Sequence, residues 1–144
     1  MKTNLPDNSR FKDLRIAITG ANGSLGQFLI KEFKEKGAYV VGLTHRKRNN
    51  QKSNEAAPDD WISWSCGEEK LLSNKLSNID ILILNHGFNP KGNIDSSTIN
   101  KAIEINSLSH WRLIQLFEDL AINENNLNQS NTKEIWINTS EAEI

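Results

Sequence analysis

The sequence predicts an α/β fold with a doubly wound parallel sheet of five strands, and three observations support this prediction. Short apolar segments alternate along the chain with segments whose apolar residues recur at helical spacing. A glycine-rich turn joins the first apolar segment to the first helical one. The chain has 144 residues, the length of one domain with one core, so we expect residues 1–144 to form a single domain.

The first third of the chain predicts a β-α-β unit. Residues 14–19 form a short apolar, β-branched run, and residues 24–36 carry apolar residues three and four positions apart. Gly37 stands where a helix C-terminal cap is expected, and residues 38–43 form a second apolar run. A strand, a helix and another strand in this order imply parallel pairing of the two strands.

The remaining elements follow the same alternation. We expect a polar surface connection over 49–60, strands over 61–65, 79–84 and 135–139, a short helix over 68–76, and one long helix over 96–122. The long helix carries more than one apolar face, so a homo-oligomer, if one forms, is expected to use it.

Composition argues against several classes of partner. Lys and Arg number 17 and Asp and Glu 18, so the net charge of −1 gives no general attraction to nucleic acid. The single cysteine and three scattered histidines lack the spacing of a metal site. No apolar run approaches the length of a membrane span, and the first residues lack a secretory signal. We therefore expect a cytoplasmic protein with no metal, no membrane contact and no nucleic-acid partner.

The turn after the first predicted strand has the composition of a phosphate-binding site. Gly20, Asn22, Gly23, Ser24, Leu25 and Gly26 place little side-chain bulk at the start of a helix. Exposed N–H groups and the helix dipole favour an anion there, as in the Rossmann-type sites that hold the pyrophosphate of a dinucleotide. These six residues are the predicted cofactor contacts of the turn. The alternative is an ordinary tight turn.

At this point the chain resembles the short-chain dehydrogenase/reductase family, whose glycine motif is T-G-x-x-x-G-x-G. Thr19, Gly20 and Gly26 are in register with that motif, while Ser24 replaces its middle glycine and Gly23 lies one place earlier. Asn85-His86-Gly87 resembles the end of the family's N-N-A-G. The resemblance implies that Asn85 and Gly87 border the cofactor, whereas His86 is expected to be an ordinary turn residue.

Two further segments resemble the family's catalytic motifs. Ile105-Asn106 is similar to V-N, whose Asn interrupts helical hydrogen bonding and positions a water in a proton relay. Residues 137–140 are similar to the I-V-N-x-S at the end of the fifth strand. The resemblance implies that Asn106 and Ser140 are catalytic residues, with Ser140 binding the substrate oxygen. The alternatives are an exposed helical Asn and a Ser that caps a strand.

The residues after the second predicted strand favour NADP(H) over NAD(H). NAD-preferring members of the family carry Asp at the position of Thr44, and a carboxylate there would repel a 2′-phosphate. His45, Arg46, Lys47 and Arg48 follow, and guanidinium groups bind phosphate through paired hydrogen bonds. Thr44 and Arg46 are the predicted contacts. The alternative is a solvated basic loop.

The family's Tyr and Lys pair, Y-x-x-x-K, belongs downstream of Ser140, and the sequence in hand ends at Ile144. Tyr39 is the only tyrosine, and no Lys follows it at the required spacing. We therefore expect the N-terminal part of an NAD(P)-dependent dehydrogenase/reductase with a carbonyl or alcohol substrate, without the family's last strands and helices and inactive alone. The alternatives are a catalytically inactive NADP-binding module and a decayed gene fragment.

Overall fold

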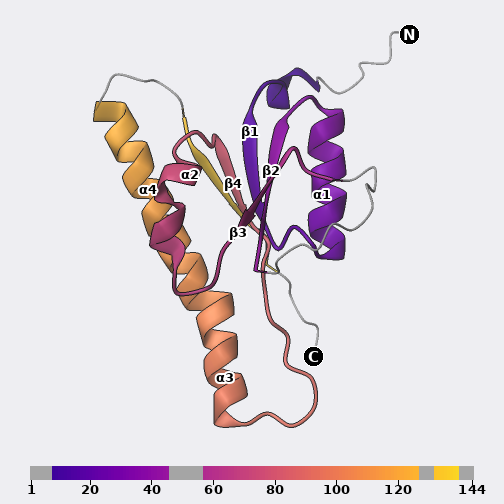
Figure 1. The fold of residues 1–144 in the computed structure, drawn as a ribbon, viewed down its shortest axis with the longest axis vertical. Coiled ribbons are helices and arrows are strands. Elements are labelled where there is room, and N and C mark those ends of the chain that lie inside the picture. The colour runs from indigo at the N-terminus through magenta and orange to yellow at the C-terminus, as the bar shows by residue number, and fades with distance from the viewer. Residues whose placement is uncertain (1–7, 46–56, 127–131, 140–144) are drawn as a thin grey trace.

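A five-stranded parallel sheet lies at the centre of the computed structural model, which describes residues 8–45, 57–126 and 132–139 (Figure 1). The strand order is β3-β2-β1-β4-β5, and each neighbouring pair is parallel. Because the order reverses beside β1, the predicted doubly wound, Rossmann-type class is confirmed. The strands are β1 (Arg15–Thr19), β2 (Tyr39–Thr44), β3 (Asp60–Ser63), β4 (Ile81–Leu84) and β5 (Glu134–Ile137).

Helices cover both faces of this sheet (Figure 1). One face packs against α1, and the other packs against η2, α2 and α4. A short 3₁₀ turn, η1, precedes the first strand. The bounds are η1 (Asn8–Phe11), α1 (Ser24–Glu35), η2 (Glu69–Leu72), α2 (Ser73–Leu76), α3 (Ser96–Ile103), η3 (Glu104–Leu108) and α4 (Ser109–Asn126).

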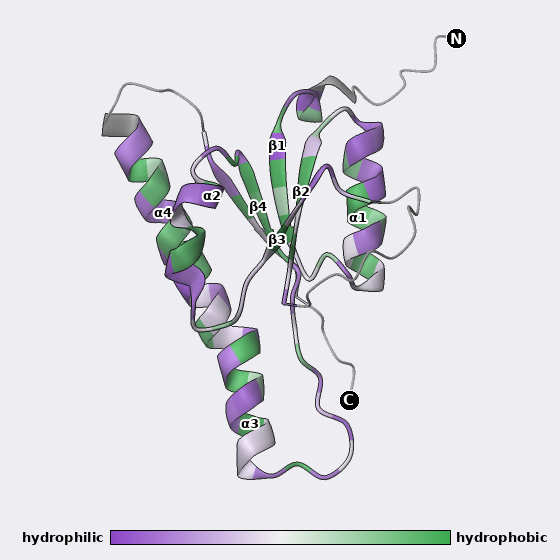
Figure 2. Ribbon diagram, viewed as in Figure 1, coloured by the Kyte–Doolittle hydropathy of each residue, from purple (hydrophilic) through white to green (hydrophobic). Residues whose placement is uncertain are grey.

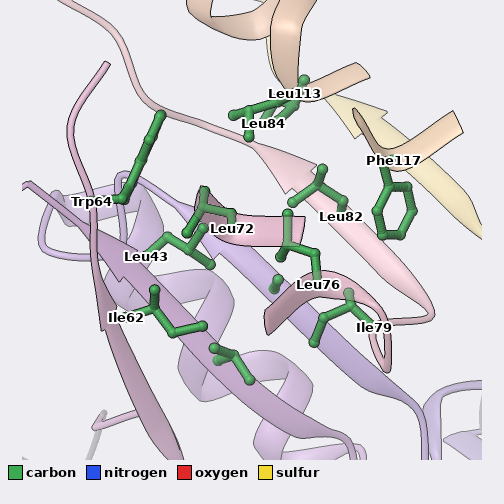
Figure 3. Packing of buried hydrophobic residues seen from close by; sticks show 12 residues of the cluster. Leu43, Ile62, Trp64, Leu72, Leu76, Ile79, Leu82, Leu84, Leu113 and Phe117 are labelled. Atoms are coloured by element: carbon green, nitrogen blue, oxygen red, sulfur yellow. The ribbon is translucent and has the colours of Figure 1, made fainter. Parts of the chain in front are cut away.

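The two faces of the sheet carry separate hydrophobic clusters because successive strand residues point to opposite sides. In β1, Ile16 and Ile18 face α1, and Ala17 faces the other layer. Figure 3 shows that second layer, in which Leu113 and Phe117 of α4 meet leucines of β4. The hydropathy colouring of Figure 2 shows largely apolar central strands and helices that carry both polar and apolar residues. Burial on both faces accounts for the continuous apolar runs in the sequence.

The strands lie within two residues of their predicted bounds, but two helices differ from expectation. The short helix expected over 68–76 is a 3₁₀ turn, η2, followed by the single α-helical turn of α2. The helix expected over 96–122 is not continuous, because a π-helical segment, η3, separates α3 from α4. A π-helical segment contains one more residue per turn than the α-helix around it. Because the apolar periodicity continues across η3, the sequence pattern does not reveal this extra residue.

None of the helices in the described part of the chain is both long and apolar enough to cross a membrane. Several large apolar side chains of α3 and α4 are exposed, among them Ile99, Ile103 and Trp111. An oligomer through this surface remains a prediction.

Candidate functional site

An open cleft of about 930 Å³ lies at the carboxyl ends of the parallel strands. In doubly wound sheets this is the edge where ligands bind, beside the point at which the strand order reverses. The structure brings most of the predicted cofactor residues together in the wall of this cleft: Gly20, Asn22, Gly23, Ser24, Leu25, Thr44, Asn85 and Gly87. Gly26 is buried behind the turn, within α1.

Two glycines of the turn are required by close backbone contacts. Gly20 has a φ of +63°, and a Cβ atom there would lie 2.7 Å from the carbonyl oxygen of Asn85. A Cβ atom on Gly26 would collide with the carbonyl oxygen of Gly20 and lie 2.8 Å from Cα of Ala21. Larger residues would therefore separate α1 from the strand ends. The turn keeps the backbone accessible along the cleft.

The first turn of α1 faces the same space. Its N-cap residue is Gly23, in an extended conformation, which has no side chain to accept hydrogen bonds from the N–H groups that follow. These groups and the helix dipole suit a phosphate, and the close glycine contacts leave room for it, so the turn fits the pyrophosphate of a dinucleotide. Ser24, which replaces the glycine of the family motif, is exposed at the cleft.

The end of β2 closes one side of the cleft. Thr44 is buried, and its Oγ1 accepts a hydrogen bond from Asn22 Nδ2 over 2.6 Å. The glycine turn is thereby joined to the strand whose end is predicted to contact the ribose. His45 also lines the cleft, whereas Arg46, Lys47 and Arg48 lie outside the described residues.

The loop after β4 closes the opposite side. Thr19 Oγ1 accepts the N–H of Asn85 over 2.8 Å, and the side chain of Asn85 accepts a hydrogen bond from Asn138 Nδ2 over 2.9 Å. Asn138 follows β5 and lines the cleft. Ser140, the other catalytic residue that the sequence predicts, lies outside the described residues.

Asn106 lies in η3 and binds the loop after β4 through both polar atoms of its side chain. Its Oδ1 accepts the N–H of Phe88 over 2.7 Å, and its Nδ2 donates to the carbonyl oxygen of Phe88 over 2.8 Å. Asn106 is exposed, as the alternative expected, but its side chain is hydrogen-bonded. The interruption of regular helical bonding that the resemblance implied is present as η3. The water relay remains a prediction.

An ionic cluster holds η3 against its neighbours. Arg112 of α4 donates two hydrogen bonds to the carboxylate of Glu104, one of them over 3.0 Å, and its guanidinium lies 3.6 Å from the buried Glu69 carboxylate. Glu69 in turn accepts the N–H of Gly67. Hydrogen bonding to Arg112 lowers the pKa of Glu104, so this carboxylate is charged at neutral pH.

The expectation that His86 is an ordinary turn residue is wrong. Its ring is mostly buried and lies 2.8 Å from Thr19 Oγ1 and 3.2 Å from Ser109 Oγ. The rings of Trp64 and His110 pack against it edge to face. Desolvation, with smaller contributions from His110 and His45, lowers the pKa of His86 to about 3. The one sequence signal was that a large polar ring stands where the family motif has alanine.

His110 of α4 lies beside His86. It is half-buried, and its Nε2 donates to the carbonyl oxygen of His86 over 2.9 Å. Sequence reasoning also missed residues of the cleft that come from other elements: Trp64, Cys66, Phe88, Lys101 and Ile105. Lys101 Nζ lies 4.6 Å from the centre of the Phe88 ring. Within the described ranges, no three His, Cys, Asp or Glu side chains are grouped to hold a metal ion.

The family model described as "NAD dependent epimerase/dehydratase family" matches residues 16–140, most of the chain. The chain belongs to this family. Membership supports a nicotinamide dinucleotide as the cofactor, and it agrees with the resemblance to short-chain dehydrogenases that the motifs carry.

A curated relative is the monoglucosyldiacylglycerol epimerase of Synechocystis sp. (strain ATCC 27184 / PCC 6803 / Kazusa). It is 38% identical over 135 residues, which cover 92% of this chain and 32% of the relative. The chain therefore spans about a third of the length of that protein.

Solved short-chain dehydrogenases share the fold. One from Leptospira borgpetersenii, with bound NAD⁺, has a TM-score of 0.71 at 20% identity, covering 95% of this chain and 55% of the other. One from Escherichia coli CFT073, complexed with NADPH, has a TM-score of 0.71 at 17% identity, covering 94% and 62%. The cleft of this chain lies at the strand edge where doubly wound folds bind dinucleotides.

Proposed function

We propose that this chain is the cofactor-binding part of an NAD(P)-dependent enzyme that oxidises or epimerises a hydroxyl-bearing carbon of a sugar. The observation that carries the proposal is the glycine turn, where Gly20 and Gly26 leave no room for a side chain between β1, α1 and the loop after β4. This turn belongs to a chain that the epimerase/dehydratase family model matches over residues 16–140.

Each side of the cleft has a distinct task in this proposal. The N–H groups that follow Gly23 bind the pyrophosphate, and Thr44 and Asn22 border the adenosine ribose at the end of β2. Asn85 and Gly87 border the nicotinamide half, and Phe88, Lys101 and Ile105, which also line the cleft, border the substrate.

The sugar substrate is inferred from the relative, whose name specifies a glycosylated diacylglycerol. When bound, an oxidised nicotinamide would supply reversible acceptance of a hydride from a carbinol carbon, and return of the hydride to the opposite face would invert that carbon. The protein must remove the hydroxyl proton and hold the oxygen. Ser140 is the proposed contact to that oxygen, and Asn106 is the proposed residue of the proton relay.

NADP(H) is the proposed form of the cofactor. The end of β2 has Thr44 in the place of a carboxylate, so it lacks the charge that would repel a 2′-phosphate. Arg46 follows two residues later, and Arg48 after it. Replacing both arginines by alanine should weaken NADPH binding while leaving NADH binding nearly unchanged. An equal loss for the two nucleotides would contradict the assignment.

The decisive experiment for the cofactor is a fluorescence titration of the chain with NADPH and NADH. Gly20→Ala should abolish measurable binding, because its Cβ would press on Asn85. Gly92→Ala is the matched control, since Gly92 also has a positive φ, of +87°, but nothing lies within 4 Å of its added Cβ. If both variants lost binding equally, the loss would reflect backbone strain rather than the collision with Asn85.

A turnover assay separates the enzyme from its principal alternative. Monoglucosyldiacylglycerol is incubated with either oxidised nucleotide and with the whole enzyme of which this chain is the proposed cofactor-binding part, and the sugar of the product lipid is identified. Conversion to an epimer or a keto sugar supports the enzymatic function. Dinucleotide binding without conversion instead favours the non-catalytic binding module.

A further inference from the structure

The imidazole of His86 lies between the two sides of the cleft. On one side it meets Thr19, the last residue of β1, and on the other Ser109, the first residue of α4. Both hydroxyl-bearing residues are fully buried. Thr19 precedes the glycine turn, and Ser109 follows the π-helical segment that carries Asn106, so the ring spans the distance between two elements of the proposed site.

The hydrogen bonds around Thr19 determine which nitrogen of His86 carries the proton. Thr19 Oγ1 already accepts the N–H groups of Asn85 and His86, over 2.8 and 3.1 Å. A hydroxyl oxygen has two lone pairs, so a third donor is excluded and the Thr19 hydroxyl must itself donate. His86 Nδ1, at 2.8 Å, is closer to it than the carbonyl oxygen of Ile83, at 3.3 Å. Nδ1 is therefore the acceptor, and Nε2–H donates to Ser109.

The surroundings of the ring keep it in this neutral form. Burial lowers the pKa of His86 first of all, and the nearby His110 and His45 side chains lower it further, to about 3. A proton on Nδ1 would also face the saturated Thr19 oxygen. On the far side of Ser109, its hydroxyl is hydrogen-bonded to the Cys66 thiol. The charged groups that act on Cys66 are Glu69, Glu104 and Arg112.

We propose that His86 is a positioning residue of the cofactor site, which sets the glycine turn relative to the Asn106 segment by bridging Thr19 and Ser109. The backbone of the same residue takes part, because Cα of His86 would lie 3.0 Å from a Cβ atom on Gly20. A shift of His86 therefore changes the space beside Gly20. The consequence for cofactor affinity rests on the dinucleotide binding proposed above.

The first test is nitrogen NMR of the ligand-free chain with labelled histidine. The expected result is a His86 ring in the Nε2–H form, unchanged between pH 5 and 8. A ring in the Nδ1–H form, or one that titrates within this range, would overturn the proposal. This measurement requires no cofactor, so its outcome is independent of the proposed function.

The second test is a cycle of variants: His86→Ala, Ser109→Ala and the pair. If the bridge acts as a unit, each single variant raises the Kd for the dinucleotide by roughly tenfold, and the double variant adds little more. Gln115→Ala, at an exposed position of α4, is the control and should leave the Kd unchanged. If the two single variants raised the Kd by factors that multiply in the double variant, the proposed bridge would be overturned.

The same cycle is read in the ligand-free chain through the amide resonance of Gly20. Ser109→Ala should shift this resonance in the native background and leave it unchanged in the His86→Ala background, because the ring transmits the change. An equal shift in both backgrounds would overturn the proposal. If the native chain bound no dinucleotide, the proposed function would fail, while this result would still decide whether His86 couples the two elements. Should His86→Ala fail to fold, the tautomer measurement and Ser109→Ala still give the answer.

Discussion

The two sides of the cleft are held in place by different means. The side made by β1, the glycine turn and α1 depends on backbone contacts, in which Gly20 and Gly26 allow main-chain atoms to approach closely. The side made by the loop after β4, η3 and α4 depends on side-chain hydrogen bonds from Asn106, His86 and Arg112.

This difference determines how each side responds to substitution. A steric requirement between backbone atoms cannot be met by another side chain, so the first side is sensitive to the smallest added group. A hydrogen-bonded side chain contributes about 1 kcal/mol net for each bond, so the second side should weaken in steps. The first side therefore acts as a rigid cradle, and the second as an assembly of separable contacts.

The largest expected effect on stability comes from replacing one glycine by alanine on each side of the cleft. Gly26→Ala should lower the free energy of unfolding by about 3 kcal/mol or more, because the new Cβ overlaps backbone atoms of Gly20 and Ala21. Gly87→Ala is the matched variant on the other side, where the added Cβ would lie 3.5 Å from Asn106 Oδ1, an ordinary contact. It should cost less than about 1 kcal/mol. Urea unfolding of both variants measures the difference, and similar losses would remove the distinction between the two sides.

The first side could be predicted from the sequence because its motif is local. Gly20 and Gly26 lie within one turn between a strand and a helix, and the strand bounds follow from short apolar runs. Thr44 was placed correctly at the end of β2 for the same reason. The Gly26 contacts lie within the turn, whereas Gly20 contacts the distant Asn85, so the sequence identified Gly20 by its place between strand and helix and not by its neighbour.

The second side could be predicted only in part because its contacts join residues far apart in the chain. Asn106 was identified through a motif, but its bonds to Phe88 span 18 residues, and those of His86 to Thr19 span 67. The extra residue in η3 leaves the apolar periodicity intact, so a continuous helix was predicted. The ion pair between Glu69 and Arg112 likewise requires the folded arrangement of η2 and α4.

The next effect concerns Asn106, whose two hydrogen bonds hold Phe88. Asn106→Ala should lower the free energy of unfolding by about 2 kcal/mol, one for each bond, and should speed hydrogen exchange of the Phe88 amide. Asn106→Asp keeps the acceptor for the Phe88 N–H but turns a carboxylate oxygen toward the Phe88 carbonyl. It should therefore restore only part of the protection. Unchanged exchange at Phe88 in the alanine variant would show that the loop is held by other contacts.

A smaller effect follows from the neutral state of His86. Its pKa is about 3 in the folded chain and near 6.5 when unfolded, so the unfolded chain binds the extra proton between these values. The stability contribution is complete above pH 6.5 and is lost as the pH falls toward 3, by roughly 1.5 kcal/mol between pH 6.5 and 5. His86→Gln cannot titrate and should show a flatter dependence over this interval in urea unfolding. Parallel curves for the two proteins would mean that His86 keeps an ordinary pKa in the fold.

The smallest effect tests whether side-chain bonding also matters on the first side. Asn22 donates to Thr44 over 2.6 Å, and Asn22→Ala removes this link without adding bulk to the turn. If backbone contacts dominate here, the free energy of unfolding should fall by no more than about 1 kcal/mol. Gln27→Ala is the control, because Gln27 donates to the carbonyl oxygen of Asn22 from an exposed position. It should change stability by less than about 0.5 kcal/mol. A loss for Asn22→Ala as large as that for Gly26→Ala would place this side, too, among the parts of the site held by side-chain hydrogen bonds.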